Sequence, residues 1–374
     1  MIVLHIAGTL FFAATAAYLL LALLRVTAYR PGSPPVASQP AVTVMLPCHG
    51  APPRLYECLR SVCEQDYAGP VQVVFGLHGP DDAAKPVIER LIADLPGIDA
   101  EIVIDPRRAG ANPKNCNLIN MMAAVREDLL VIVDSDVLVT RNFLTAVTAP
   151  FIDEGVGAVT CLYTGAPEAN LASRLGALYH NDWFVPSVLV DVALSGLHIT
   201  YGAATAVTRR ALDGIGGFEA MASAVAQDYV LGFELRRAGW QIALATEVVA
   251  TVVAEPDLST LYRHESRWVR NIRAVRPSDH LLWILTSSLA PLVLLALAWP
   301  TAWIFVAVQL TLRAILHDLL RRRFTLPAAE PQLLPLREAF NFALWIGSFF
   351  SRRVRWGGQV MVTGDGLSMR KDAP

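Results

Sequence analysis

Charged residues are scarce in this sequence. Asp, Glu, Lys and Arg make up 17% of its 374 residues, whereas soluble domains usually carry about 25%, and apolar residues reach 54%. The formal net charge of −2 also lacks the positive excess that nucleic-acid-binding proteins need to neutralise phosphates. This composition excludes a nucleic-acid binder and indicates a protein that is not wholly soluble.

Paired cysteines are lacking as well. The five cysteines are an odd number and form no CxxC pair, which excludes a disulfide framework and a structural zinc site. A reducing compartment is therefore favoured. The cysteines are Cys48, Cys58, Cys63, Cys116 and Cys161.

The amino-terminal region is predicted to be a membrane anchor over residues 1–30. Residues 6–24 are uncharged and long enough to cross a hydrocarbon core of about 30 Å at about 1.5 Å per residue. A signal peptide is the alternative, but no Lys or Arg precedes the run and no small-x-small cleavage site follows it. Arg25 and Arg30 lie after the run, which predicts an external amino terminus, a linker over residues 31–41 and a cytoplasmic domain.

Residues 42–255 are predicted to form an α/β domain. Short apolar runs alternate with helical stretches, a pattern typical of βα units around a mostly parallel sheet. The predicted strands are residues 42–46, 71–77, 101–104, 129–133 and 156–163, and the predicted helices lie near 54–64, 83–95, 114–125 and 141–149.

The carboxyl-terminal region is predicted to return to the membrane. Residues 256–280 are expected to be a juxtamembrane helix. Residues 281–298 and 302–312 then form an apolar hairpin, joined at Trp299-Pro300 and followed by Arg321, Arg322 and Arg323, which predicts cytoplasmic ends. Residues 339–350 are too short to span alone, so an interfacial helix is predicted, with a third span as the alternative. Residues 351–374 are predicted to be a basic cytoplasmic tail, disordered from residue 364.

Two groups of carboxylates follow predicted strands. Asp134-Ser135-Asp136 comes directly after residues 129–133, where open α/β sheets bind ligands, and such a pair can hold a divalent cation with a diphosphate. A strand-end turn is the alternative. Asp81-Asp82 follows residues 71–77, so the same rim is predicted; a cap for the next helix is the alternative.

Two further motifs lie downstream. Asp228, in Gln227-Asp228-Tyr229, follows Gly216-Gly217-Phe218 and fits either a helix cap or a general base. His264-Glu265-Ser266-Arg267-Trp268 precedes the apolar hairpin. It fits either a basic helix attracted to anionic lipid or a site in which Arg267 neutralises a phosphate and Trp268 shapes an acceptor pocket.

In this order, the four features resemble the family 2 and 21 glycosyltransferases of GT-A fold, whose pattern is D, DxD, (E/Q)D and (Q/R)xxRW. The NPKxxN motif at residues 112–117 resembles the ceramide glucosyltransferase branch. Four further segments are most similar to bacterial hopanoid biosynthesis-associated glycosyltransferases: CLYTG (161–165), SRLGAL (173–178), QDYVLG (227–232) and HESRWVRNIR (264–273).

The resemblance implies a role for each matching residue. It implies that Asp82 or Asp81 binds the uridine end of a UDP-sugar, that Lys114 binds the donor, and that Asp228 is the catalytic base. It implies Asp134 and Asp136 as the site of Mg²⁺ or Mn²⁺ and of the diphosphate, with Arg267 and Trp268 near diphosphate and acceptor. Two departures stand out: Ala83 follows Asp82 where the family has Pro, and His264 replaces the first Gln or Arg of the last motif, which predicts a weaker hydrogen bond to the diphosphate.

These features together predict an inverting enzyme that moves a sugar from a UDP-sugar onto a hydroxyl of a membrane lipid. A hopanoid acceptor of the bacteriohopanetetrol type is expected, with ceramide or diacylglycerol as alternatives, and the sugar is N-acetylglucosamine, glucose or glucuronic acid. The expected location is the bacterial inner membrane. The rival functions are a processive polysaccharide synthase and a non-catalytic membrane scaffold.

Overall fold

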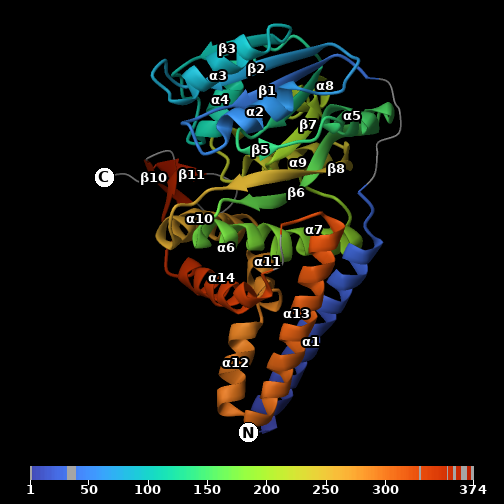
Figure 1. Cartoon of the computed structure of the whole chain (residues 1–374), viewed down its shortest axis with the longest axis vertical. Helices are drawn as coiled ribbons and strands as arrows, with labels where there is room; N and C mark the ends of the chain where they lie inside the picture. The colour runs from blue at the N-terminus through green and yellow to red at the C-terminus, as the bar shows by residue number, and fades with distance from the viewer. Residues whose placement is uncertain are drawn as a thin grey trace. The chain divides into compact units, whose positions relative to one another are not determined.

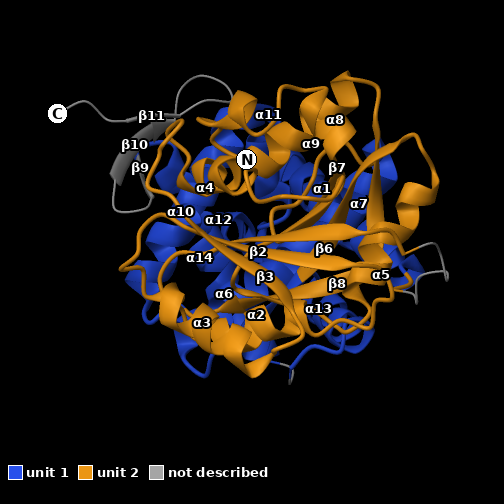
Figure 2. Ribbon diagram, turned by 90° about the horizontal axis from the view of Figure 1, so that it is seen from above, with its two compact units in different colours: residues 1–29, 164–196, 255–366 blue, residues 30–163, 197–254, 367–374 orange. Residues whose placement is uncertain are grey.

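The chain divides into two compact units, each assembled from separate stretches of sequence (Figure 2). In this computed structural model the described residues are 2–31, 39–327, 330–351, 353–356, 359–363 and 369–371. Most of the predicted linker and part of the predicted tail therefore lie outside the described residues. The α/β unit comprises residues 30–163, 197–254 and 367–374, and the helical unit comprises residues 1–29, 164–196 and 255–366. The predicted 42–255 domain is divided between them, since residues 164–196 belong to the helical unit.

The α/β unit contains one eight-stranded sheet with the order β3-β2-β1-β4-β7-β6-β8-β5 (Figure 1). Strands β1 to β4 run parallel to one another. Strand β7 is antiparallel to both β4 and β6, and β5 is antiparallel to β8. The strands are β1 (Val42–Pro47), β2 (Val71–Leu77), β3 (Asp99–Ile104), β4 (Leu129–Val133), β5 (Val137–Leu138), β6 (Val156–Pro167), β7 (Ala204–Thr208) and β8 (Gln241–Val253).

Helices cover both faces of this sheet. Because successive strand residues point to opposite faces, Val44 packs in one core with Leu59 of α2, and its neighbour Met45 packs in another with Leu118 of α4 and Leu231 of α9. The helices of the unit are α2 (Leu55–Cys63), α3 (Ala84–Asp94), α4 (Pro113–Met121), α5 (Phe143–Thr148), α8 (Arg209–Asp213) and α9 (Gln227–Arg237), with 3₁₀ turns η1 (Ala149–Ile152) and η3 (Glu219–Met221).

The predicted strands and helices of this unit all occur. The predicted strand 156–163 lies within β6, which is antiparallel to β7. Three strands, β5, β7 and β8, are not among the predicted ones, and together with β6 they form the antiparallel part of the sheet.

The helical unit is built mainly from α-helices, and its helix α1 lies beside α13 (Figure 1). Its elements are α1 (Ile2–Ala28), α6 (Leu171–Tyr179), η2 (His180–Phe184, a π-helix), α7 (Val185–Ser195), α10 (Leu258–Val275), α11 (Pro277–Leu282), η4 (Trp283–Leu285), α12 (Leu289–Ala298), η5 (Pro300–Ala302), α13 (Trp303–Arg323), η6 (Pro331–Leu333), α14 (Leu334–Ser348), β9 (Arg353–Trp356) and β10 (Gln359–Thr363). Strands β9 and β10 pair antiparallel.

Two helices of the described residues are long and apolar enough to cross a membrane: Ile2–Ala28 and Pro300–Arg323. Pro277–Leu285 and Leu289–Ala298 meet the same criterion as a pair, with a bend of 56° between them. The first predicted hairpin segment, residues 281–298, is therefore broken rather than continuous. The second continues to Arg323, so the three arginines predicted to follow it form the last turn of α13.

The structure describes parts of two segments near the carboxyl terminus, the predicted interfacial helix and the predicted disordered tail. Helix α14 covers most of the predicted interfacial segment 339–350, has 15 residues and is not one of the candidate spans. Residues Met369–Lys371 form a short strand, β11, within the segment predicted to be disordered. That prediction was wrong for these three residues, while residues 364–368 and 372–374 lie outside the described residues.

Candidate active site

Helix α4 presents Lys114 at its first turn because the asparagines around it bind backbone elsewhere in the α/β unit. Asn112 caps the helix, since its side-chain oxygen accepts a hydrogen bond from the Asn115 backbone N–H at 3.1 Å. Pro113 occupies the position where a missing N–H costs nothing. The Asn115 Nδ2 donates to the Phe218 carbonyl at 2.6 Å. These bonds fix the start of the helix and thereby fix Lys114.

Lys114 lies among three carboxylates. Its Nζ forms an ion pair with Asp134 and donates to the Gly202 carbonyl at 3.1 Å. Burial alone lowers the pKa of Lys114, but the charge of Asp134, together with those of Asp228 and Asp136, outweighs burial and raises it. Lys114 is therefore a fixed positive charge at neutral pH.

Asp134 and Asp136 emerge at the carboxyl end of β4, the strand that lies between the parallel and the antiparallel parts of the sheet. The Asp134 backbone N–H donates to the Ala203 carbonyl at 3.0 Å, which joins this end of β4 to the segment before β7. The Asp136 carbonyl accepts from the Val252 N–H at 2.8 Å. Both backbones are thus held by the antiparallel strands, while both side chains remain partly exposed.

The donor chemistry of this pair fits Mg²⁺ or Mn²⁺. Both cations prefer oxygen ligands, and Mg²⁺ usually takes one or two protein carboxylates and completes its shell with water and substrate phosphates. Within the described residues, no group of three or more His, Cys, Asp or Glu side chains could hold a metal ion. An ion at this site would therefore take two carboxylates, Asp134 and Asp136, from the protein.

Asp228 is the second residue of α9, after Gln227, and the N-cap of the helix is Ala226. Asp228 is therefore not the N-cap residue of α9, which was one of its two predicted roles. A carboxylate in the first turn still interacts favourably with the helix dipole. Burial raises the pKa of Asp228, and the neighbouring Lys114 charge opposes that rise. A carboxylate with a raised pKa that remains under the influence of a nearby cation is well matched to accept a proton.

Gly202 permits the close approach of Asp228. A Cβ atom at residue 202 would lie 2.7 Å from the Asp228 Oδ2, closer than real Cβ contacts. The Thr200 hydroxyl also donates to the Asp228 carbonyl at 2.6 Å. The segment before β7 therefore contacts Asp228, Asp134 and Lys114 through backbone or hydroxyl groups.

Asp82 lies at the carboxyl end of β2 and is held by backbone. Its Oδ1 accepts from the Gly50 N–H at 2.8 Å and from the Ala84 N–H at 2.9 Å, and its Oδ2 lies 3.0 Å from the His49 Nδ1. Burial raises the pKa of Asp82, but these hydrogen bonds outweigh burial and lower it. Asp81, by contrast, is exposed. The predicted cap role of Asp82 is present in part, because the Ala84 N–H lies at the start of α3.

In the helical unit, α10 carries the His264 to Trp268 motif in its interior. The His264 Nδ1 lies 2.6 Å from the Glu255 Oε1, and the His264 ring is 4.5 Å from the Trp268 ring. Burial raises the pKa of Glu255, but the hydrogen bond from His264 outweighs burial and lowers it. The His at the first motif position is thus bound to a carboxylate, an environment that the motif itself does not indicate.

His180 and Tyr179 also contact Trp268. Their ring centroids lie 5.3 Å and 6.1 Å from that of Trp268. Burial, together with the positive charge of Arg337, lowers the pKa of His180 to about 3. His180 is therefore neutral at physiological pH and contributes an uncharged face to this aromatic cluster.

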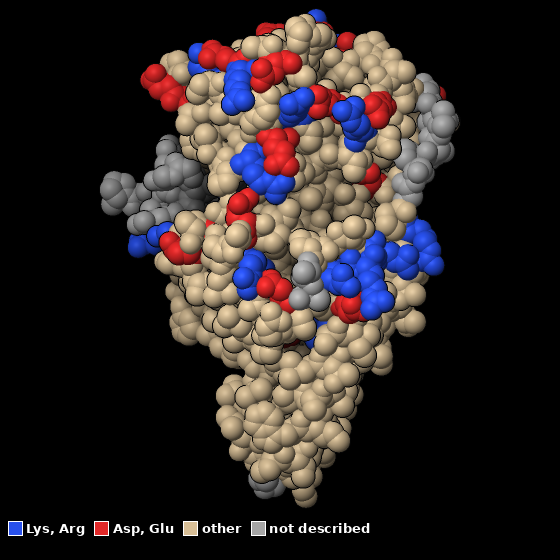
Figure 3. All heavy atoms as spheres, in the orientation of Figure 1, with Lys and Arg blue, Asp and Glu red and all other residues tan. Residues whose placement is uncertain are grey.

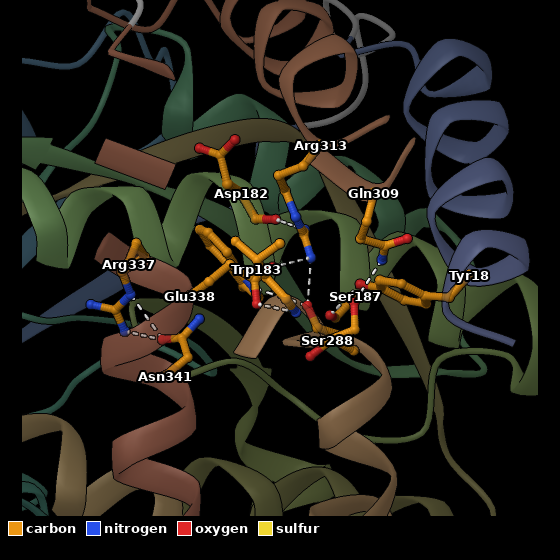
Figure 4. A network of polar contacts seen from close by, with 12 residues as sticks. Tyr18, Asp182, Trp183, Ser187, Ser288, Gln309, Arg313, Arg337, Glu338 and Asn341 are labelled. Carbon is orange, nitrogen blue, oxygen red and sulfur yellow. Dashed lines mark hydrogen bonds and ion pairs between the residues drawn. The ribbon is translucent and has the colours of Figure 1, made fainter. Parts of the chain in front are cut away.

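The helical unit also contains buried ionic groups that the sequence analysis did not single out (Figure 4). Arg337 of α14 pairs with Glu265 of α10, and both are at most 2% exposed. Arg313 of α13 pairs with Glu338 at 3.1 Å, and its guanidinium lies 4.6 Å from the centre of the Trp183 ring. The paired residues lie 25 positions apart for Arg313 and Glu338 and 72 positions apart for Arg337 and Glu265, so no local spacing could have revealed them.

Gly202, His49 and Glu255 are further residues that the sequence analysis did not identify. Gly202 could have been suspected from its place two residues before a β-branched run, but the strand β7 was itself not predicted. His49 lies two residues after the end of β1, which is a detectable position near a strand end. Glu255 has no detectable signal, because its partner His264 lies nine residues away on another element.

The sheet is mixed and mostly parallel, and an acidic pair lies at the end of its central strand. A half-buried lysine pairs with Asp134, and a further carboxylate lies on α9. This arrangement defines the GT-A class of α/β fold. The predicted fold class is confirmed. The sequence profile of glycosyl transferase family 21 matches residues 7–369. The chain belongs to this family.

Known proteins similar to the chain agree with this class. Ceramide glucosyltransferase 1 of Caenorhabditis elegans is 25% identical over 244 residues, which is 65% of this chain and 52% of that protein. An N-acetylglucosaminyltransferase of Mesorhizobium japonicum is 34% identical over 134 residues, 34% of this chain and 30% of that protein. The chain thus spans about half the length of the Caenorhabditis protein, and 30% of the length of the Mesorhizobium protein.

A solved structure shares the fold over almost the whole chain. The mannosyltransferase of Pyrobaculum calidifontis, in complex with GDP-Man and Mn²⁺, is 21% identical, with a TM-score of 0.56. The match covers 93% of this chain and 98% of that one. At this identity, the likeness supports the fold and not the choice of substrate.

Proposed function

We propose that this chain is an inverting glycosyltransferase that moves a sugar from a UDP-sugar onto a hydroxyl of a membrane lipid. The observation that carries the proposal is the meeting of Lys114 with Asp134 beside Asp228 in a member of glycosyl transferase family 21. A cation and carboxylates at the carboxyl end of a central strand suit a charged donor and a proton transfer.

The proposed step is a single displacement. The Asp228 carboxylate accepts the proton of the lipid hydroxyl, whose oxygen forms a bond to the anomeric carbon while the bond from that carbon to the UDP oxygen breaks. Attack from the face opposite the leaving UDP inverts the anomeric configuration. The Lys114 charge supports this step because it favours the ionised form of Asp228.

The departing diphosphate carries the charge that the site must balance. Asp134 and Asp136 would hold Mg²⁺ or Mn²⁺, which when bound supplies positive charge to the leaving diphosphate. Lys114 adds a hydrogen-bond donor there, and Asp82, or Asp81 as the alternative, is proposed at the uridine end. Arg267, with His264 and Trp268 on the same helix, is proposed to bind near the diphosphate and the acceptor.

A lipid acceptor is supported by the apolar helices of the helical unit. In the part of the chain that the structure describes, two helices, or three spans if the bent pair is one, are long and apolar enough to cross a bilayer. A lipid can reach a membrane-bound enzyme laterally. A hopanoid of the bacteriohopanetetrol type is the proposed acceptor, on the resemblance of residues 161–165, 173–178, 227–232 and 264–273. Ceramide is the alternative that the similarity to ceramide glucosyltransferases favours, and the sugar is glucose or N-acetylglucosamine.

The proposed location is the bacterial inner membrane, with the α/β unit in the cytoplasm. The proposal depends on the positions of Arg25 and Arg321 to Arg323 at the ends of α1 and α13. A cysteine introduced at exposed Arg107 should be labelled by a membrane-impermeant maleimide only after the cells are opened, because the α/β unit is proposed to lie in the cytoplasm. Four of the five native cysteines are buried and Cys63 is half-buried, so the parent without the new cysteine measures the background labelling. Labelling in intact cells would overturn this orientation.

A UDP-release assay tests the proposed reaction. The purified full chain in lipid nanodiscs should release UDP faster when acceptor lipid is present, and Asp228→Asn should remove that increase. Asp213→Asn is the matched control, since Asp213 is exposed at the end of α8. Release that is equal with and without acceptor would contradict lipid transfer, and no release from any UDP-sugar would favour the scaffold reading.

A further inference from the structure

The carboxyl-terminal ends of α1 and α13 form one joint surface, although they are far apart in sequence (Figure 1). The Arg323 Nη2 donates to the Thr27 carbonyl at 2.8 Å. The rings of Tyr29 and Phe324 stack with their centroids 5.7 Å apart. The two helix ends are therefore fixed against each other, and their side chains act as one surface.

Arginines dominate this surface, and among the described residues a single carboxylate, Asp318, forms ion pairs with them. Arg321 and Arg322 share Asp318, at 3.4 Å and 2.8 Å. In the part of the chain that the structure describes, no ion pair involves Arg25 or Arg323. Figure 3 shows this concentration of basic side chains above the apolar lower part of the molecule. We call it the arginine cluster; its members are Arg25, Arg321, Arg322 and Arg323.

Two members of the cluster are exposed and two are half-buried. Arg25 is exposed and the Arg322 side chain is 71% exposed, whereas Arg321 and Arg323 are half-buried. Two arginines of α10 differ, because they are engaged within the helical unit. The Arg270 Nη1 donates to the Arg353 carbonyl at 2.6 Å, and the Arg273 Nη1 donates to the Ser348 carbonyl. Arg25 and Arg322 are thus more available to a membrane ligand than these two arginines.

Exposed apolar side chains lie next to the cluster on the same two helices. Leu24 is 66% exposed and Leu20 is 51% exposed on α1, and Ile315 is 51% exposed on α13. When α1 and α13 cross a bilayer, these side chains contact acyl chains and the arginines lie at the level of the headgroups. A ligand that carries both a phosphate and acyl chains would contact both parts of this surface.

We propose that the arginine cluster binds an anionic phospholipid of the surrounding membrane. A guanidinium donates two parallel hydrogen bonds to phosphate oxygens, and anionic membrane surfaces attract basic residues near the ends of spans. A free phosphate would have only the exposed, screened charges, whereas a lipid also contacts Leu24 and Ile315. The proposal depends on α1 and α13 spanning a membrane, and it is independent of sugar transfer.

Native mass spectrometry of the full chain in detergent tests the proposal by counting bound lipids. The probes are phosphatidylglycerol and phosphatidylcholine with identical acyl chains. We expect the parent to retain phosphatidylglycerol preferentially and the variant R25Q/R321Q/R322Q/R323Q to lose about tenfold or more of that affinity. The control variant R90Q/R107Q/R126Q/R141Q removes the same charge from exposed positions of the α/β unit and should bind as the parent does.

Several outcomes would overturn the proposal: equal binding of the two lipids by the parent, unchanged binding by the cluster variant, or an equal loss in the control variant. Displacement of phosphatidylglycerol by an equal concentration of inorganic phosphate would show a phosphate site without lipid recognition. If the fourfold variant does not fold, R25Q/R322Q keeps the Arg323 bond to Thr27 and should show a smaller loss in the same direction. The lipid count does not depend on turnover, so an inactive enzyme does not obscure the result.

Discussion

Arg337 and Glu265 form a two-bond fork in the interior of the helical unit. The Arg337 Nη1 donates to the Glu265 Oε1 at 2.9 Å and its Nη2 donates to the Glu265 Oε2 at 2.6 Å. The same guanidinium donates to the Asn341 side chain and to the Leu175 carbonyl. Three helices, α6, α10 and α14, are thus joined at one side chain, beside the motif that carries His264, Arg267 and Trp268.

The first prediction concerns this fork. Arg337→Met should lower stability by about 3 to 5 kcal/mol, because it leaves the Glu265 carboxylate buried without its cation. The double variant R337M/E265L should recover part of that loss, because no charge remains buried. Thermal unfolding in a single detergent measures both. A double variant that is less stable than R337M would show that the fork does not act as a pair.

The second prediction concerns Asp228 as the base. General base catalysis by a positioned side chain contributes about 10² to 10⁴ in rate, so Asp228→Asn should lower kcat by about that factor with little change in the affinity for UDP-sugar. A helix-terminal role alone would be largely kept by Asn. Near-normal turnover in a well-folded Asp228→Asn protein would therefore remove Asp228 from the mechanism.

The third prediction concerns pH. Asp228 must be ionised to act, and burial raises its pKa, so kcat should fall on acidification at a pH above the ordinary range of an aspartate, about 3.9. Lys114 opposes that rise, so Lys114→Met should move this acidic limb to still higher pH at saturating donor. Lys85→Met, on the exposed face of α3, should leave the limb in place. A limb that does not move in Lys114→Met would contradict the coupling.

The fourth prediction concerns the cation. Asp134→Asn and Asp136→Asn should each weaken Mn²⁺ binding in the presence of UDP by at least about 10- to 100-fold. Loss of a residue that only hydrogen-bonds a metal ligand already lowers metal affinity by about that factor, and these two aspartates are the proposed ligands themselves. Electron paramagnetic resonance of free Mn²⁺ measures this without turnover. Asp213→Asn should bind Mn²⁺ as the parent does. Full activity in excess chelator would argue against any divalent cation in the reaction.

Much of the α/β unit could be predicted because its parallel strands are continuous apolar runs. Strand β4, LLVIV, is buried throughout, and it ends at the carboxylates that the sequence analysis selected. Strand β8 is harder to detect, because its 13 residues alternate irregularly between buried and partly exposed positions. The direction of β6 could not be read from composition, since an apolar run is the same in a parallel and in an antiparallel pair.

The candidate site could be predicted only in part, for a similar reason. Asp134 and Asp136 follow a strand, and Lys114 lies in a motif with a cap and a proline, so local pattern identifies all three. Gly202 and Glu255 act through contacts with residues that are distant in sequence or on other elements. Such contacts arise from the tertiary fold, and one sequence alone does not encode them in a readable spacing.

The central claim, transfer of a sugar to a lipid hydroxyl, is tested most directly by following an isotope-labelled sugar. The purified chain in nanodiscs is given UDP-sugar labelled in the sugar ring together with candidate lipids, and the lipid fraction is analysed by mass spectrometry and by NMR of the anomeric carbon. The account predicts labelled glycolipid with inverted anomeric configuration, formed by the parent and by Asp213→Asn but not by Asp228→Asn. Label that stays in free sugar or UDP-sugar, or a lipid product of retained configuration, would contradict it.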